Sequence, residues 1–526
     1  MICKGKQIPG FILTLLVLLT LAYGQSSMNG DHALSVASMP PLLELEKTLI
    51  DNLEDYANAL QQKLETLRSH IPVIRAENEK GRKDALFYLS NPLNSFSLIR
   101  RLHQDWPKWR QYMEQPVGPA QIRNLNSWLK DVPKNSDLND ACAGIARIQN
   151  IYSLQVEDLV RGKIDGKEYN ISMSSADIFA VGHYLENGTA GAQAVPWLQV
   201  VLDRFQEDPL VPAPLAVEKI DVLKLLAKCH LSKKLYAKAL TLLEEGLKLQ
   251  AYNADVLRLW QKAQNSTEVL ANCTLEENKK PECAMMKRFR LGCKGLLKGS
   301  TRLRCSYNFT TTPFLRLAPL KVEKVGLHPS VELYHDVLSP RETAQLIELA
   351  SVRLRPSSVI GVKAYKRIRT AKARWINRDL NELTRRILRR IRDMTGLDLT
   401  VSEKFQVINY GLGGHYFMHK DYFNRTRARE RMFGDRVATV LFYLTDVDQG
   451  GATVFPESGY TIYPRAGTAL LWYNLHTNGS CDPSTMHAAC PVIVGSKWVM
   501  TEWISERRQI FIRPCRPLSR VTSAKS

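Results

Sequence analysis

The sequence lacks a long apolar run after its N-terminus. Phe11 to Ala22 is apolar, but this stretch is shorter than the roughly 20 residues that cross a bilayer. Lys4 and Lys6 precede it, and Ala22-Tyr23-Gly24 offers small residues for cleavage, which is the pattern of a secretory signal peptide. We therefore expect a signal at 1–24, no transmembrane segment, and a protein that stays in the lumen of the secretory pathway.

Acidic residues are few relative to basic ones. The chain has 52 Asp and Glu residues against 72 Lys and Arg residues, so its formal net charge is +20. Such a charge can attract nucleic acid, but the expected luminal location excludes that partner. The basic residues concentrate between Lys363 and Arg392. This segment is either a solvated basic face or a surface that attracts an acidic partner chain.

Cysteines are moderate in number. Of the 10 in the chain, Cys3 would leave with the signal, so an odd number remains and at least one is unpaired or pairs with another chain. Cys142 and Cys229 stand alone in helical segments and are expected to be buried thiols.

Sequons for N-glycosylation are frequent, which makes some glycosylation expected in a secreted chain. Asn424 lies too close to the candidate metal site to be expected in use. The other candidates are Asn170, Asn187, Asn265, Asn272, Asn308 and Asn478.

With 526 residues, the chain has room for about three or four domains. Near its start, apolar residues recur with a period of about 3.67 residues per turn, which predicts a long, nearly straight helix. The apolar stripe must be buried, either in a self-paired coiled coil at about 42–71 or against other helices of the same chain. Its members are Leu42, Leu45, Leu49, Leu53, Tyr56, Leu60, Leu64, Leu67 and Ile71.

The segment 143–265 has the pattern of antiparallel helices. We expect them at Ala176–Tyr184, Ala194–Phe205, Ala216–Leu231 and Tyr236–Leu249. The last of these has the small-residue and leucine rhythm of a tetratricopeptide unit, and such units form concave grooves that bind peptides. A purely structural helical spacer is the alternative.

The pattern changes to period two after a cysteine- and Lys/Arg-rich connector at 266–330. Val331–Val337 is a predicted strand, Ser339–Val352 is a predicted helix with an N-cap serine, and Leu380–Met394 is a second helix. Several strands with Gly and Pro turns follow Phe405. This region is therefore expected to be a double-stranded β-helix, the jelly-roll architecture.

Two histidines and one aspartate in this last region have the spacing of a metal site. His419 and Asp421 lie two positions apart, so one strand end can direct both to the same face. His487 would join them from another strand. Two imidazoles and one carboxylate form the facial triad that binds ferrous iron and leaves positions open. Lys497, further on, can bind the far carboxylate of a dicarboxylic co-substrate.

Four segments around these residues resemble, in order, the catalytic domain of the collagen prolyl 4-hydroxylase alpha-subunit family. They are NYGLGGHY from Asn409, ATVLFYLTDVDQGGATVFP from Ala438, GTALLWYN from Gly467 and HAACPVIVGSKWVMTEWI from His487. Weaker matches lie at 91–106 and at Asp177, Phe179, Gly182 and Trp197.

The resemblance implies a multidomain α + β chain. Its first part would be a helical dimerisation domain at 25–142, which contains the coiled coil. A tetratricopeptide-like peptide-substrate-binding domain at 143–265 and the connector would follow. The last parts would be an Fe(II)/2-oxoglutarate dioxygenase domain at 331–515 and a tail at 516–526. It also implies disulfides between Cys293 and Cys305 and between Cys490 and Cys515.

The resemblance further implies that His419, Asp421 and His487 bind Fe(II). Lys497 would bind 2-oxoglutarate, with Tyr410 and Thr439 as further pocket residues. The implied reaction is hydroxylation of peptidyl proline with O2, releasing succinate and CO2, with L-ascorbate re-reducing the iron. Protein disulfide isomerase would be the beta subunit of an alpha2beta2 assembly. This partner would retain the chain in the endoplasmic reticulum, because 521–526 has no retention signal.

The sequence departs from the family at two places. The tyrosines of the peptide groove are replaced at Glu186, Gly191, Ala192, Leu225, Lys228 and Leu231. Ser505 stands where the family has a histidine. Two alternatives therefore stay open: the same dioxygenase chemistry on a non-collagen substrate, and a weakly active or non-catalytic peptide-binding subunit.

Overall fold

The computed structural model describes residues 31–188, 191–205, 216–270, 283–297, 304–358, 368–423 and 434–515. The expected signal peptide, the tail, Asn272 and Asn424 lie outside these residues. The chain divides into two compact units, one with Met39–Lys134 and one with Asp31–Ser38 and Asn135–Ser526. Within the described part, no helix has the length and apolar character that a membrane span requires.

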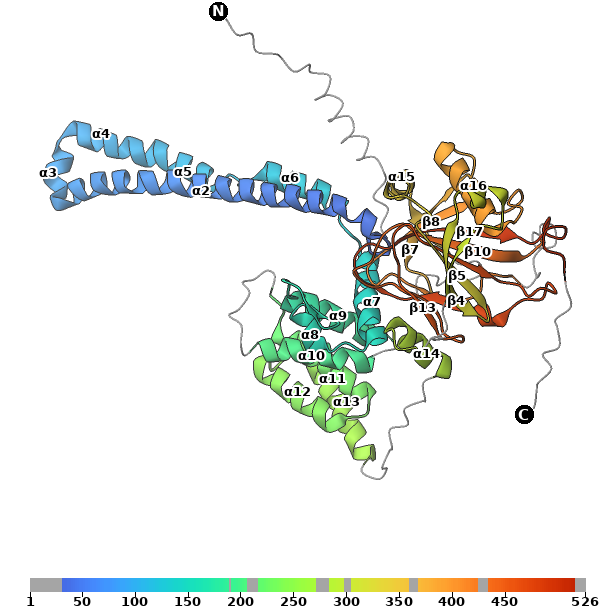
Figure 1. Cartoon of the computed structure of the whole chain (residues 1–526). Helices are drawn as coiled ribbons and strands as arrows, with labels where there is room; N and C mark the ends of the chain where they lie inside the picture. Colours follow the sequence, from blue (N-terminus) through green and yellow to red (C-terminus); the bar gives the residue numbers. More distant parts are fainter. Residues whose placement is uncertain are drawn as a thin grey trace, which may run out of the picture. The chain divides into compact units, whose positions relative to one another are not determined.

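The first unit is a helical hairpin. Its long arm is α2 (Pro40–Lys83), and α3 (Ala85–Ser90) turns the chain. The chain then runs back along α2 in α4 (Pro92–Arg100), a π-helical turn (Arg101–Asp105), α5 (Trp106–Glu114) and α6 (Pro119–Trp128) (Figure 1).

The predicted long helix is present as α2, which has 44 residues. Its apolar stripe is covered along one part of the helix and exposed along another. Leu45, Leu49 and Tyr56 are half-buried within this unit. Leu53 is 67% exposed and Ile71 is 49% exposed. The hairpin therefore covers only part of the stripe, and self-pairing through the remainder stays a prediction.

The second unit begins with a short segment that sequence patterns do not assign to it. Within Asp31–Ser38, residues 32–35 are buried against the barrel, where the Ser35 hydroxyl donates to Asn409 Oδ1 at 2.6 Å. At the other end, α7 (Asn135–Tyr152) also belongs to the second unit. The expected domain boundary at 142/143 therefore falls inside a helix. The reason is that the apolar face of α7 packs on other elements of the second unit.

The helical part of this unit continues from α7 through consecutive antiparallel helices. Its elements are α8 (Val156–Val160), the hairpin β1 (Lys163–Ile164) and β2 (Lys167–Glu168), α9 (Ser175–Asn187), α10 (Gly191–Arg204), α11 (Lys219–Ser232), α12 (Tyr236–Leu249) and α13 (Ala254–Leu270). Each helix from α9 to α13 packs on the next, and the expected helices are confirmed. Ile178, Trp197 and Leu198 form the centre of this core and are fully buried.

The described part of the barrel contains two main antiparallel sheets and the short antiparallel pair β11-β16. The larger has the order β3-β4-β5-β14-β10-β17-β8-β7-β6 and the smaller has the order β13-β12-β15-β9. The bounds are β3 Arg304–Asn308, β4 Leu320–Leu327, β5 Ser330–His335, β6 Arg355–Pro356, β7 Ala371–Ile376, β8 Phe405–Tyr410, β9 Tyr416–His419, β10 Arg436–Tyr443, β11 Gln449–Gly450, β12 Thr453–Phe455, β13 Tyr460–Ile462, β14 Ala469–Tyr473, β15 His487–Ala489, β16 Val492–Val494 and β17 Trp498–Ser505. This arrangement confirms the expected jelly roll.

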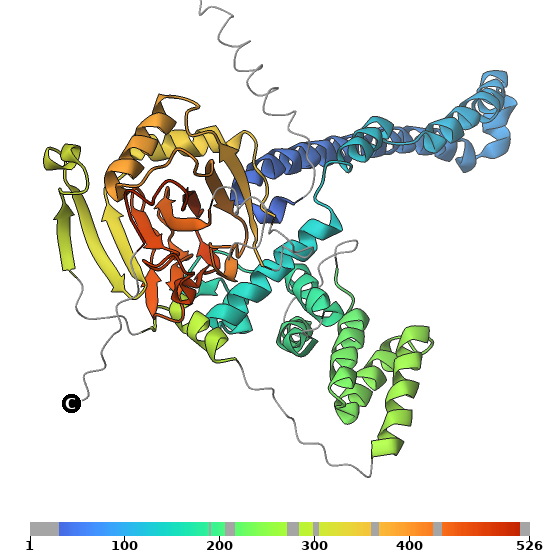
Figure 2. The same cartoon turned by 90° about the vertical axis from the view of Figure 1, so that its right-hand side faces the viewer.

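Side chains of the larger sheet alternate between two cores, as period two requires. One face packs Val407, Val440 and Met500 against the helices α15 (Pro340–Ser351) and α16 (Glu382–Thr395). Figure 2 shows these yellow and orange helices on one side of the curled strands. The opposite face directs Tyr410, Trp472 and Val499 into the barrel.

The segment 266–330 is not a connector where the structure describes it. Two of its strands, β3 and β4, extend the larger sheet, and α14 (Ala284–Cys293) packs on β12. This packing brings Cys293 to Cys490, and the two form a disulfide. The implied pairings are therefore wrong: Cys305 is an exposed thiol on β3, and Cys515 is also an exposed thiol. Cys293 and Cys305 are close in the sequence but do not pair, because α14 packs on the smaller sheet and places Cys293 beside Cys490.

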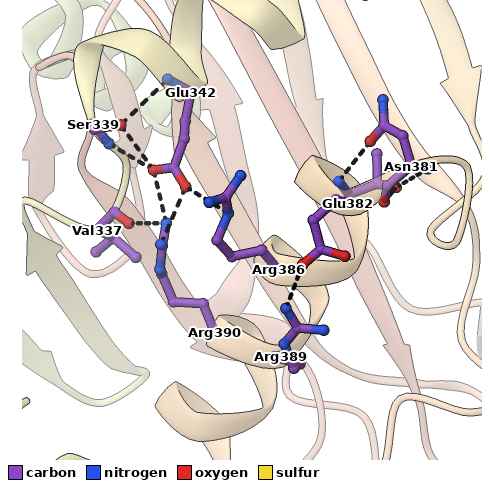
Figure 3. A network of polar contacts seen from close by, with 9 residues as sticks. Val337, Ser339, Glu342, Asn381, Glu382, Arg386, Arg389 and Arg390 are labelled. Atoms are coloured by element: carbon purple, nitrogen blue, oxygen red, sulfur yellow. Dashed lines mark hydrogen bonds and ion pairs between the residues drawn. The ribbon is translucent and has the colours of Figure 1, made fainter.

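An ion-pair network joins the two covering helices (Figure 3). Glu342 closes a capping box with Ser339 at the start of α15. Its carboxylate also accepts from Arg390 of α16 at 3.0 and 3.2 Å, and it lies 3.4 Å from Arg386. Glu382 pairs with Arg389 at 2.7 Å on the more exposed side. Several arginines of the basic segment that ends at Arg392 thus have acidic partners on the same surface.

Candidate active site

The smaller sheet brings the two histidines together. His419 ends β9 and His487 begins β15, and the antiparallel register makes them direct partners. Asp421 follows β9 by two residues. One possible ligand atom from each of the three side chains lies within 4.8 Å of the others. The expected triad is therefore assembled from two neighbouring strand ends that are far apart in the sequence.

The two imidazoles present the same nitrogen to this centre. His419 Nδ1 lies 2.8 Å from the Phe417 carbonyl oxygen, and His487 Nδ1 lies 3.0 Å from that of Thr485. A carbonyl accepts only from a protonated nitrogen, so Nδ1 carries the hydrogen on each ring and the Nε2 lone pair is available. The Nε2 atoms lie 3.7 and 3.8 Å from the Asp421 carboxylate.

Burial sets the charge states that metal binding requires. It lowers the pKa of His419 to about 3, so that imidazole is neutral near pH 7. Burial alone would raise the pKa of Asp421, but the neighbouring His487, His419 and Arg436 and the hydrogen bond from Thr439 together hold it below its ordinary value. Two imidazole donors and one ionised carboxylate suit ferrous iron.

The Asp421 carboxylate is held by a further hydrogen-bonded pair. Thr439 Oγ1 on β10 donates to Asp421 Oδ2 at 2.8 Å. Asn474 Nδ2 donates in turn to Thr439 Oγ1 at 2.9 Å. Thr439 was expected in the 2-oxoglutarate pocket; it lines the cavity beside the triad, and its hydroxyl is directed to the Asp421 carboxylate. Partners of this kind commonly fix the geometry of metal ligands.

A small cavity of ≈ 40 Å³ opens beside the triad. It also contains Lys497, which is only 1% exposed. The Lys497 ammonium donates to the Gly451 carbonyl oxygen at 2.5 Å and lies 5.0 Å from the centre of the Tyr410 ring. Its burial lowers the pKa of Lys497 to about 7, and no charged group among the described residues offsets this effect. The site can therefore accept an anion.

Tyr410 lies at the same end of the cavity as Lys497. Burial raises the pKa of Tyr410 to about 12, so its phenol stays protonated and can donate a hydrogen bond. The complete lining is Arg369, Ile408, Tyr410, Tyr416, His419, Asp421, Thr439, Leu441, Thr453, Trp472, His487, Ala489, Lys497, Val499, Thr501 and Trp503. Triad, Lys497 and Tyr410 thus meet in one cavity.

Several lining residues were missed from the sequence, among them Arg369, Thr453 and Trp503. Arg369 stacks on Tyr416, with its guanidinium carbon 4.7 Å from the ring centre, and is 5% exposed. It precedes β7, well before the motif segments, and no local pattern marks it. Thr453 and Trp503 lie inside quoted motifs, and strand alternation could have assigned them to the barrel interior.

Ser505 does not line the cavity. Its hydroxyl donates to the Val401 carbonyl oxygen at 3.3 Å, and it is 8% exposed. In the helical region, Leu225 is 4% exposed and belongs to the core rather than to a groove surface. Three of the other groove positions are half-buried: Glu186, Lys228 and Leu231. The side chain of Ala192 is not among those that the structure describes.

The candidate glycosylation sites differ in exposure. Asn170, Asn187 and Asn478 are exposed. Asn308 is half-buried, and its amide nitrogen lies 3.4 Å from the Met394 carbonyl oxygen as a donor. The side chain of Asn265 lies outside the description. Cys142 and Cys229 are buried thiols, as expected.

Comparison with known proteins identifies the family of this chain. Residues 35–166 match the N-terminal region of the prolyl 4-hydroxylase alpha subunit, and 405–505 match the 2OG-Fe(II) oxygenase superfamily.

The chain is 30% identical to prolyl 4-hydroxylase subunit alpha-2 of Gallus gallus, covering 95% of this chain and 98% of that protein. It is 31% identical to prolyl 4-hydroxylase subunit alpha-2 of Caenorhabditis elegans, over 93% and 94% of the two chains. For prolyl 4-hydroxylase subunit alpha-1 of Mus musculus the identity is 29%, over 96% and 99%. This chain belongs to the prolyl 4-hydroxylase alpha-subunit family.

Proposed function

We propose that this chain is the catalytic alpha subunit of a prolyl 4-hydroxylase. It would hydroxylate peptidyl proline in collagen-like or other luminal proteins, using Fe(II), O2 and 2-oxoglutarate and releasing succinate and CO2. The observation that carries the proposal is the joint opening of the His419, Asp421 and His487 triad and the buried Lys497 on one cavity.

The triad would hold Fe(II) through two Nε2 atoms and the Asp421 carboxylate, with Thr439 fixing that carboxylate. Ferrous iron with open coordination positions supplies the activation of O2, coupled to the decarboxylation of 2-oxoglutarate. The protein orients the reactants and excludes water. Leu441, Ala489 and Val499 give the cavity apolar walls that suit this role.

Lys497 would bind the 5-carboxylate of 2-oxoglutarate. A buried ammonium without an acidic partner is strongly stabilised by an incoming carboxylate. Tyr410 would add a neutral donor at the same end. In this arrangement the keto acid would span from Lys497 to the metal, and the substrate proline would approach the remaining open position.

The helices α9–α13 would bind the peptide that carries the proline, as a repeat-type groove. The missing groove tyrosines favour a second candidate, the same chemistry on a peptide that is not polyproline-like. A weakly active or non-catalytic subunit would have no use for four correctly placed polar groups in one cavity.

Family membership also supports the expected assembly. Protein disulfide isomerase would be the beta subunit, with L-ascorbate as reductant, in the lumen of the endoplasmic reticulum. The tetratricopeptide assignment, the signal peptide and the N-glycans belong to the same proposal.

Succinate release tests the activity. The chain is coexpressed with protein disulfide isomerase and assayed with Fe(II), 2-oxoglutarate and ascorbate, on a (Pro-Pro-Gly) repeat and on a proline-poor peptide. We expect release that depends on the repeat and is lost in His487→Ala together with bound iron. His476→Ala is the matched control, because this histidine lies outside the cavity. If iron-loaded wild-type protein releases no succinate with either peptide, the proposed enzymatic activity is refuted.

A further inference from the structure

The last residue of α7 touches the loop that holds the buried lysine. Tyr152 is 6% exposed, and its hydroxyl donates to the Pro491 carbonyl oxygen at 2.7 Å. Tyr152 lies outside the expected dioxygenase domain, whereas Pro491 follows β15 by two residues. A helix from the region assigned to peptide binding therefore contacts the backbone beside the active site.

Pro491 is also hydrogen-bonded to Gly451, the residue whose carbonyl oxygen accepts from Lys497. Its carbonyl oxygen also accepts from the Gly451 N–H at 3.0 Å. The Gly451 carbonyl oxygen in turn accepts from Lys497 Nζ at 2.5 Å. Three hydrogen bonds thus lead from the Tyr152 hydroxyl to the ammonium, and the two Gly451 bonds use the two sides of a single residue.

The backbone of this loop leaves little room for adjustment. Gly450 and Gly451 have φ values of +76° and +68°, which L side chains rarely adopt. A Cβ on Gly450 would lie 2.6 Å from the Pro491 oxygen and 2.8 Å from the Tyr152 hydroxyl. On either side of Pro491, Cys490 N–H donates to the Ala452 oxygen at 2.8 Å and Val492 N–H to the Gly414 oxygen at 3.0 Å.

We infer that Tyr152 is a positioning residue for 2-oxoglutarate binding. It fixes the Pro491 carbonyl, and through Gly451 it sets where the Lys497 ammonium lies. This inference rests on the proposed function of Lys497. It assigns to α7 a role in co-substrate affinity, in addition to joining the helical region to the barrel.

The test compares Tyr152→Phe with wild type in the assembled complex with protein disulfide isomerase. Dissociation constants for 2-oxoglutarate are measured by calorimetry with Mn(II) in place of iron, so that binding is read without turnover. Loss of one hydrogen bond predicts a Kd about three- to tenfold higher. In the assay, KM for 2-oxoglutarate should rise similarly, while kcat and the KM for peptide stay near their wild-type values.

Tyr169→Phe is the matched control. The Tyr169 hydroxyl donates to Gln449 Oε1 at 2.9 Å, so it is a second tyrosine bond between the same two regions that does not reach Pro491. An unchanged Kd in this variant is expected. Equal weakening in both variants, or an unchanged Kd in a folded Tyr152→Phe protein, would overturn the inference.

A double-mutant cycle tests whether the effect passes through the lysine. In a Lys497→Met background, Tyr152→Phe should cause no further loss of affinity, and additive losses would overturn the inference. Thermal melting of each variant establishes that it is folded. A wild type that binds 2-oxoglutarate but releases no succinate refutes the proposed function alone. A wild type that binds none refutes both.

Discussion

Lys497 shows how a single side chain is tuned by its surroundings. It is among the largest fully buried side chains of the protein, and desolvation lowers its pKa to about 7. Its hydrogen bond to a neutral carbonyl leaves donors available on the ammonium. Near neutral pH the free site is therefore a mixture of charged and uncharged lysine, and only the charged form can pair with a carboxylate.

This gives the affinity for 2-oxoglutarate a defined pH dependence. The bound carboxylate raises the pKa of Lys497 again, so binding above pH 7 takes up a proton. We expect Kd to be nearly constant below pH 7 and to rise on going from pH 7 to pH 9. Calorimetry in two buffers of different ionisation enthalpy measures both the affinity and the proton uptake.

Lys497→Arg provides the comparison for this prediction. A guanidinium stays charged throughout this range, so the variant should show a flat pH profile whatever its absolute affinity. A wild-type Kd that is equally flat between pH 7 and pH 9 would mean that Lys497 remains protonated in its cavity.

At the scale of elements, the covering helices show the difference between buried and exposed ion pairs. Glu342 is 8% exposed and combines the cap of α15 with two hydrogen bonds from Arg390. Burial would raise the pKa of Glu342, but Arg390 and Ser339 more than offset it, and the pKa is lowered overall. Glu382 makes similar contacts to arginine on an exposed surface (Figure 3).

Glu342→Gln should therefore destabilise the barrel in a pH-dependent way. A carboxyl with a lowered folded pKa contributes stability above its unfolded pKa and loses it as pH falls through the folded value. We expect the free energy of unfolding at pH 7 to fall by about 1–2 kcal/mol, with the difference disappearing toward pH 3. Urea denaturation followed by tryptophan fluorescence at both pH values measures this.

Glu382→Gln is the paired variant for this experiment, with little or no expected effect, because water already solvates that carboxylate. Equal losses in the two variants would contradict the importance of burial at Glu342.

At the scale of the whole molecule, one covalent bond joins distant parts of the chain. Cys293 and Cys490 are separated by 197 residues, and their disulfide fastens α14 to the smaller sheet. The segment that reads as a connector thereby becomes part of the barrel. Cys490 directly precedes Pro491, so this bond and the Tyr152 contact restrain the same short stretch.

Cys293→Ser should lower the free energy of unfolding of the barrel by about 2–4 kcal/mol, because a cross-link over a long loop restricts the unfolded chain. Cys305→Ser should have little effect, since this thiol is exposed on β3. Peptide mapping under non-reducing conditions should recover the Cys293 and Cys490 peptides linked. Recovery of a Cys293–Cys305 link, or equal losses in both variants, would contradict the observed pairing.

The sequence by itself determined the elements and the reactive set. Periodicity and caps act over a few residues, so α2, α12 and α15 could be predicted. The spacing of His419, Asp421 and His487, together with the resemblance of the segments around them, predicted a triad. Lys497 and Tyr410 were found because they lie in the same motif-bearing segments of the sequence.

Only the tertiary structure decided which partner each side chain takes. Thr439 turns to Asp421, Cys293 pairs with Cys490, and Tyr152 reaches Pro491. These contacts join residues whose separation in the sequence carries no local signal. They form because strands and helices bury their apolar faces together, and the polar groups brought inside must then find hydrogen-bond partners.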